Sequence, residues 1–175
     1  ALQMRSLNPG LARSKIESFF GKDADYAAIR AHRIELMNAH IEAHGVDEKP
    51  GIRALLALLK EKNIPCAITS SSSIPLIREH LGNLGLLEGF TALCSGKDVP
   101  HGKPAPDIYL HGAASLDLPP ESCLALEDSP IGILAAHRAG CITVMIPDQD
   151  RPDAETEQRL SAKADSLADV IGLLE

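Results

Sequence analysis

Short apolar runs alternate with helix-like patterns through the second part of the chain. Four apolar runs have the length of buried strands: 64–69, 90–94, 123–126 and 141–146. Stretches whose apolar residues recur every three to four positions lie between and after them: 52–63, 73–84, 106–116, 129–140 and 167–174. A further short strand is expected near Ala164. Alternating strands and helices predict an α/β fold with a parallel sheet covered by helices on both faces.

The first part of the chain contains helical patterns alone. Residues 11–20 predict a short helix, and residues 25–44 predict a longer one that ends at Gly45. The longer helix carries an apolar stripe made of Tyr26, Ile29, Ile34, Met37 and Ile41. Lys49-Pro50-Gly51 looks like a joint. We therefore divide the chain into a helical part, 1–48, and an α/β core, 49–175.

The strand 123–126 runs directly into two carboxylates, Glu127 and Asp128. Ser129 is a typical helix N-cap, and Pro130 suits the first helical position. Ligands of open α/β sheets bind at the carboxyl ends of the strands, where this acidic pair is expected to lie. Taken alone, the pair could equally be a solvated loop in which one carboxylate favours the helix N-terminus.

Two other segments place polar groups after strands. Ser70 to Ser73 follow the first strand and precede a helix, so their hydroxyl and N–H groups suit an anion such as phosphate. Lys103 precedes Pro104 and Pro106, which stiffen the loop that would hold its positive charge. Serines, a lysine and carboxylates at one sheet edge suit Mg²⁺ bound together with a phosphate group. The combination predicts phosphoryl-transfer chemistry.

Charge and composition narrow the partners. The 175-residue chain has a net charge of −7, which argues against a broad nucleic-acid or membrane surface. No apolar run is long enough to span a bilayer, and we expect a cytoplasmic protein that binds a small phosphorylated metabolite. The four cysteines lie in or beside apolar runs and are expected to be buried free thiols. His40 and His44 could form a zinc pair, but no zinc signature surrounds them, and an exposed helix face is the better interpretation.

Three segments together resemble the haloacid dehalogenase superfamily, in particular its β-phosphoglucomutase and phosphoglycolate-phosphatase branch. They are Ala67-Ile68-Thr69-Ser70-Ser71, the run from Gly102 to Tyr109, and Leu126-Glu127-Asp128-Ser129 with the Gly- and Ala-rich helix behind it. The resemblance covers residues 45–175 well and the helical part more loosely. It implies a Rossmann-like core with a partial α-helical cap in residues 1–48.

The resemblance also implies a role for each motif residue. Ser70 would hydrogen-bond the transferring phosphoryl group, with the Ser71 backbone N–H assisting. Lys103 would neutralise the phosphoryl oxygens and the nucleophile. Asp128 would bind Mg²⁺, and Glu127 would bind it too or lie just behind it. Arg5 falls near the position where such caps place substrate-contacting residues.

The family's first motif, Asp-x-Asp-Gly-Thr on an N-terminal strand, has no counterpart here. Its first Asp is the nucleophile and its second the general acid/base, whereas this sequence has no Asp before Asp23. The corresponding strand would lie centrally, between the strands that end at Thr69 and Leu126. We therefore expect the chain to be part of a longer protein, or to receive this strand from a second chain.

Three functions fit these residues to different degrees. The leading one is a Mg²⁺-dependent phosphomonoester phosphatase. A sugar phosphomutase uses the same residues, but its cap must also keep water out and let the sugar phosphate turn round. The alternative is a non-catalytic module, or inactive fragment, that binds phosphate and Mg²⁺ without turnover. A receiver-type signalling domain is disfavoured, because its Lys-Pro loop follows the last strand, whereas the Glu127 strand and another strand follow Lys103 here.

Overall fold

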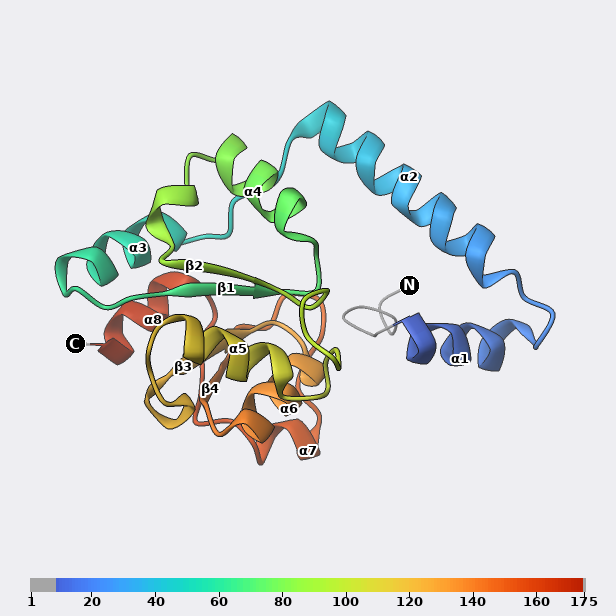
Figure 1. The fold of residues 1–175 in the computed structure, drawn as a ribbon. Helices are drawn as coiled ribbons and strands as arrows, with labels where there is room; N and C mark the ends of the chain where they lie inside the picture. Colours follow the sequence, from blue (N-terminus) through green and yellow to red (C-terminus); the bar gives the residue numbers. More distant parts are fainter. Residues whose placement is uncertain (1–8, 175) are drawn as a thin grey trace.

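The computed structural model describes residues 9–174. Two helices come first, and strands and helices alternate after them (Figure 1). The helices are α1 (Pro9–Phe20), α2 (Tyr26–His44), α3 (Ile52–Glu61), α4 (Ile74–Asn83), α5 (Asp107–Ser115), α6 (Pro130–Ala139), α7 (Ala154–Glu157) and α8 (Leu167–Leu174), with short 3-10 turns η2 (Leu87–Gly89) and η3 (Pro120–Ser122). The strands are β1 (Ala67–Ser70), β2 (Ala92–Ser95), β3 (Leu124–Glu127), β4 (Ile142–Met145) and β5 (Ala162–Lys163).

Every strand pair in residues 9–174 is parallel. Strand β1 pairs with β2, and β3, β4 and β5 form a second sheet in that order. Strands β1 and β3 do not pair with each other within this range. The predicted α/β, Rossmann-like fold is confirmed, whereas the central strand expected between β1 and β3 stays a prediction.

Helices cover both faces of the larger sheet. On one face, Ala125 of β3 packs with Ile108 of α5 and Ala135 of α6. On the other, Val144 of β4 packs with residues of α3 and α8, among them Val170. Val144 and Val170 are fully buried, and burial of a side chain of this size contributes roughly 1.5–3 kcal/mol. This packing fixes the sheet and therefore the loops at its carboxyl edge.

Helices α1 and α2 extend away from the sheets (Figure 1). The Asp25 side chain caps α2 by accepting a hydrogen bond from the Ala28 N–H at 2.9 Å. The predicted helix is confirmed, yet none of its residues is buried, and its apolar stripe is open at Ile29 and Met37. The division of the chain at residue 48 stays a prediction.

The histidine pair on α2 behaves as an exposed helix face. The rings of His40 and His44 stack with their centroids 4.6 Å apart, and the Nδ1 atom of His44 lies 3.1 Å from the His40 carbonyl oxygen. No group of three metal-ligating side chains exists in the described part of the chain. Both histidines are exposed on the helix.

Strand β1 is shorter than the apolar run predicted. Asn63 adopts a positive φ of 54° after α3, and the Ile64 N–H donates to the Leu59 carbonyl at 2.8 Å. Pro65 has no N–H to give to a strand ladder. Residues 64–66 therefore belong to the connection after α3, and strand geometry begins only at Ala67.

Helix α7 was missed by the sequence patterns. It has only four residues, too few to show a helical period, and it begins where the Asp153 side chain accepts from the Thr156 N–H at 2.8 Å. The hydrogen bond from Thr156 is the main reason that the pKa of Asp153 is lowered. The predicted last helix and the short strand near Ala164 are both present.

The four cysteines are free thiols, as expected. Cys94 and Cys141 are buried, whereas Cys66 and Cys123 are half-buried, so the expected burial holds for two of the four. Burial raises the pKa of the Cys141 thiol to about 11, with a smaller contribution from Cys123. Thiolate forms are therefore disfavoured at this position near neutral pH.

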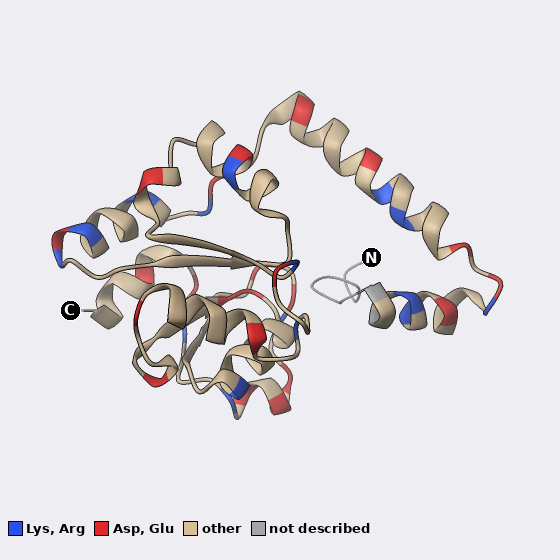
Figure 2. Cartoon of the chain, in the orientation of Figure 1, with Lys and Arg blue, Asp and Glu red and all other residues tan. Residues whose placement is uncertain are grey.

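Charged side chains of both signs are interspersed along the elements rather than sorted onto separate helices (Figure 2). None of the helices within residues 9–174 is long and apolar enough to cross a membrane.

Candidate functional site

The carboxyl ends of β1, β3 and β4 border a cavity of about 650 Å³. Five of the six predicted site residues line it: Ser70, Ser71, Lys103, Glu127 and Asp128. The sixth, Arg5, lies outside the described residues. The structure therefore brings together Ser71, Lys103 and Glu127, which lie 32 and 24 residues apart in the sequence, as the parallel sheet predicted.

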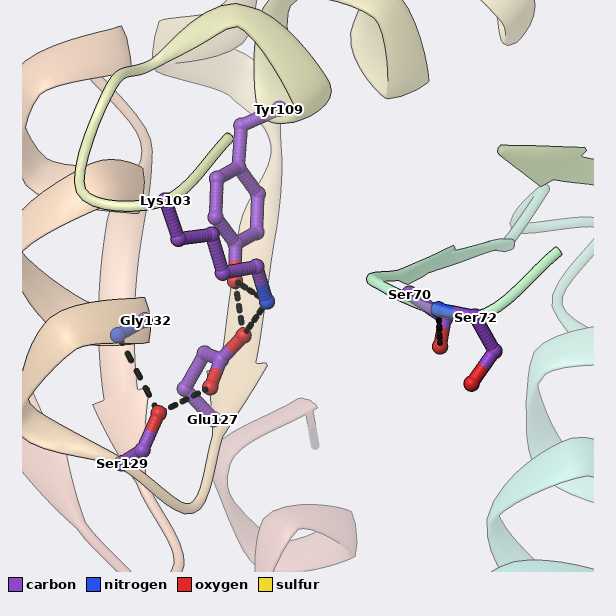
Figure 3. Close-up of polar contacts among 7 residues, drawn as sticks. All are labelled: Ser70, Ser72, Lys103, Tyr109, Glu127, Ser129 and Gly132. Atoms are coloured by element: carbon purple, nitrogen blue, oxygen red, sulfur yellow. Dashed lines mark hydrogen bonds and ion pairs between the residues drawn. The ribbon is translucent and has the colours of Figure 1, made fainter. Parts of the chain in front are cut away.

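Lys103 and Glu127 form a buried ion pair at this edge. Only 8% of each side chain is exposed, and the Lys103 Nζ donates to the Glu127 Oε1 (Figure 3). Tyr109 completes the group: its hydroxyl accepts from Lys103 Nζ at 3.1 Å and donates to Glu127 Oε1. Opposite charges removed from water need such additional hydrogen bonds to be tolerated.

The second oxygen of Glu127 is held by the start of α6. The Ser129 hydroxyl donates to Glu127 Oε2 at 3.3 Å and accepts from the Gly132 N–H at 3.2 Å (Figure 3). Ser129 is the helix N-cap, as predicted. A Cβ on Gly132 would lie 1.9 Å from Glu127 Oε2, so the carboxylate occupies the space that any other residue would fill. The three atoms nearest to such a Cβ all belong to the Glu127 carboxylate.

Residues 70–73, called the serine loop below, face the Lys103–Glu127 ion pair from the end of β1 (Figure 3). The Ser70 Oγ accepts from the Ser72 N–H at 3.1 Å, which closes a tight turn. Ser73 is the N-cap of α4 but makes no side-chain capping bond. The Ser73 hydroxyl therefore does not cap this helix.

Ser95 of β2 anchors the serine loop from behind. It is fully buried, and its Oγ donates to the Ser72 carbonyl at 2.7 Å and accepts from the Lys97 N–H at 3.0 Å. The Gly96 N–H donates to the Ser70 carbonyl at 2.7 Å. These bonds fix the backbone whose N–H groups are predicted to face a phosphate.

Burial sets the electrostatics of the group. Desolvation, followed by the charge of Glu127, raises the pKa of Tyr109 well above its usual value. The phenol therefore stays protonated and can donate to the carboxylate over the whole physiological range.

The oxygen donors suit a hard cation. Mg²⁺ is commonly held by one or two carboxylates together with waters and substrate phosphates, and it does not need a full protein cage. Asp128 lines the cavity next to Glu127, while both Glu127 oxygens already accept hydrogen bonds. The residues present fit a Mg²⁺ ion that takes Asp128 as its protein ligand from this chain, with Glu127 behind it.

Sequence reasoning assigned no role to Tyr109 or Ser95. Tyr109 belongs to the Gly102–Tyr109 motif, but only the fold shows that its hydroxyl reaches Glu127, 18 residues later. Ser95 ends an apolar run, and a polar residue in that position is a weak hint of a buried hydrogen-bonding role.

A second hollow, of about 970 Å³, lies along α2. Its charged lining residues, Arg30, Glu35 and Glu42, are exposed. It offers no buried chemical group comparable to Lys103 and Glu127.

Comparison with known proteins identifies the family. The sequence profile of the haloacid dehalogenase-like hydrolases matches residues 8–146. The chain belongs to this family. The resemblance inferred from the three motifs is thereby confirmed.

Similar proteins are named as phosphatases and as a phosphoglucomutase. Hexitol phosphatase A of Escherichia coli (strain K12) is 38% identical over 124 residues, which cover 71% of this chain and 56% of that protein. β-Phosphoglucomutase of Bacillus subtilis (strain 168) is 41% identical over 99 residues, which cover 56% of this chain and 42% of that protein. The chain thus spans about half the length of the curated relatives that it matches.

Solved structures show the same fold. CbbY from Rhodobacter sphaeroides in complex with xylulose-(1,5)-bisphosphate has a TM-score of 0.72 and 26% identity, over 93% of this chain and 75% of that one. The fold similarity therefore includes the helical part as well as the α/β core.

Proposed function

We propose that this chain supplies the phosphate-binding and Mg²⁺-binding half of a phosphomonoester phosphatase site. The observation that carries the proposal is the shared cavity at the ends of β1 and β3, lined by Ser70, Lys103 and Asp128. A buried ammonium, hydroxyls and backbone N–H groups on a fixed loop, and a carboxylate beside them match the charge of a phosphate–Mg²⁺ pair.

Each residue has a separate task in the proposal. Ser70 and the backbone of Ser71 hydrogen-bond two phosphoryl oxygens, while Lys103 neutralises negative charge that grows during transfer. Asp128 holds Mg²⁺, which neutralises further phosphate charge when bound. Glu127 keeps Lys103 in place through their ion pair.

The nucleophile is proposed to come from a strand inserted between β1 and β3. An Asp carboxylate on this strand attacks phosphorus, the substrate oxygen leaves with a proton from a second Asp, and water then hydrolyses the aspartyl phosphate. The separation of β1 and β3 into two sheets within residues 9–174 supports this position for the strand. An upstream segment of the same protein, or a second chain, would supply it.

The substrate is proposed to be a small phosphorylated metabolite, in keeping with the names of the relatives. A phosphatase is favoured over a mutase, because hydrolysis does not require the cap to exclude water while a sugar phosphate turns round.

The test uses protein expressed from the complete gene, with its mass and N-terminal sequence checked against the DNA. A panel of phosphomonoesters is assayed for phosphate release with and without Mg²⁺. We expect Mg²⁺-dependent turnover that falls at least about a hundredfold in Asp128→Asn and in Lys103→Met. Asp117→Asn is the matched control, because Asp117 is exposed at the end of α5 and Asn also tolerates its positive φ.

The remaining outcomes separate the alternatives. Phosphate and Mg²⁺ binding by calorimetry without turnover of any ester would favour the non-catalytic module. No binding and no turnover would reject the proposed site altogether.

A further inference from the structure

Tyr109 is a buried residue whose hydroxyl meets both charges of the site. It is the third residue of α5, and only 6% of it is exposed. Its hydroxyl accepts from Lys103 Nζ at 3.1 Å and donates to Glu127 Oε1, while the Lys103 Nζ lies 4.9 Å from the centre of its ring (Figure 3). One side chain thus contacts the ammonium through two separate features, the oxygen and the ring.

A phenol is suited to this position because one oxygen can accept and donate at once. The ammonium only donates and the ionised carboxylate only accepts, so the hydroxyl links them without leaving either bond unmade. A lysine side chain alone has a flexible four-carbon stem, so its ammonium can adopt many positions. With the hydroxyl in place, the Nζ atom is tied to two oxygens at once.

Helix α5 holds Tyr109 rigidly because it packs directly against β1. A Cβ on Gly112 would lie 2.7 Å from the Thr69 Cγ2, so the helix approaches the strand more closely than any other residue would permit. Thr69 immediately precedes Ser70, the last residue of β1. Tyr109 therefore lies between the end of β1, where the serine loop starts, and the end of β3.

We propose that Tyr109 is a positioning residue, whose hydroxyl fixes the Lys103 ammonium and the Glu127 carboxylate so that the ammonium faces the serine loop. The proposal deepens the proposed function and rests on it for the kinetic consequence. Its structural consequence, an ordered Lys103 ammonium, does not depend on turnover.

The first experiment follows the Lys103 ammonium by NMR in protein labelled with ¹⁵N-lysine. Buried ammonium protons tied to two oxygens exchange slowly, so a Lys103 ¹H–¹⁵N correlation is expected, assigned by its absence in Lys103→Met. In Tyr109→Phe, which keeps the ring but removes the hydroxyl, we expect this signal to broaden beyond detection. Tyr26→Phe is the matched control, because Tyr26 is the chain's other tyrosine and lies on α2.

The NMR result decides the structural part whatever the enzyme does. Absence of the Lys103 signal in the unmodified protein, or an unchanged signal in Tyr109→Phe, would overturn the proposal. Loss of the signal in Tyr109→Phe alone supports it even if no substrate is ever turned over, in which case only the proposed function fails.

The second experiment compares steady-state kinetics in the complete protein. Because the hydroxyl acts through Lys103 on charge that develops during transfer, kcat is expected to fall about tenfold while KM changes less than about twofold. A purely structural role would lower the unfolding midpoint of Tyr109→Phe and leave kcat unchanged, and that result would also overturn the proposal.

Discussion

The carboxylate of Glu127 fills the space that a side chain at Gly132 would need. A Cβ on Gly132 would lie 1.9 Å from Oε2 and 2.1 Å from Cδ of Glu127. The carboxylate is held there by Lys103, Tyr109 and Ser129. The glycine is therefore required by the placement of a charged group, and its own φ is not in the left-handed region.

Gly132→Ala is expected to displace the Glu127 carboxylate and to lower the free energy of unfolding by about 1–3 kcal/mol, as overpacking of a filled site does. Urea denaturation measures the change. Gly172→Ala in α8 is the control, because a Cβ there meets nothing within 4 Å and alanine favours a helix. Equal stability of the two variants would show that the carboxylate moves aside without cost.

Removal of Glu127 is expected to destabilise the protein more than removal of Lys103. Glu127→Leu leaves a buried ammonium, for which the loss is typically about 3–5 kcal/mol. Lys103→Met leaves a carboxylate that still accepts from the Tyr109 and Ser129 hydroxyls, so its loss is smaller. The double variant should lose less than the sum of both, and strictly additive losses would refute a coupled pair.

Ser95→Ala is expected to loosen the serine loop. The change leaves the Ser72 carbonyl and the Lys97 N–H without the hydrogen bonds that Ser95 now makes to them. We expect this to lower the free energy of unfolding by about 1–3 kcal/mol. Affinity for inorganic phosphate, measured by calorimetry, should fall together with stability. Ser18→Ala is a suitable control, because the Ser18 hydroxyl bonds only to the exposed Lys15 carbonyl of its own helix in the described structure. Unchanged phosphate affinity in Ser95→Ala would separate Ser95 from the site.

The buried Cys141 thiol is expected to make stability fall in alkaline solution. Its pKa is raised from 9.0 to about 11 in the folded protein, so the unfolded chain loses this proton first. The stabilising contribution is complete below about pH 9 and is lost as the pH rises toward about 11, with a slope of at most about 1.4 kcal/mol per pH unit. Denaturation midpoints of the unmodified protein and of Cys141→Ala between pH 8 and 11 test this. Parallel pH profiles would mean that the thiol does not titrate as stated.

The sequence was most informative where one element dictates its own structure. The run at β3 with Ser129 and Pro130 behind it contains a buried strand, an N-cap and a preferred first helical residue, and each lies where expected. The positions of Ser70, Lys103 and Asp128 followed from the rule that parallel strands end at one edge. These are local signals combined with one topological rule.

The remainder depends on contacts between distant residues. The Tyr109 hydroxyl bonds a carboxylate 18 residues away, and Ser95 bonds a carbonyl 23 residues before it. No periodicity in either segment encodes such a partner. The apolar stripe of α2 is a further example, because Ile29 and Met37 are exposed. A pattern of apolar residues predicts one apolar helix face, but it does not identify the segment that packs against this face.

Lys49, at the joint between α2 and α3, lies 2.7 Å from the Asp148 carboxylate, and both residues line the cavity. The side chains are 60% and 33% exposed, so the pair is worth about 1 kcal/mol or less and is screened by salt. The tie between the joint and the rim of the cavity therefore weakens as ionic strength rises. The salt concentration around the molecule thus sets the strength of this exposed contact beside the site, whereas the buried Lys103–Glu127 pair is much less sensitive to it.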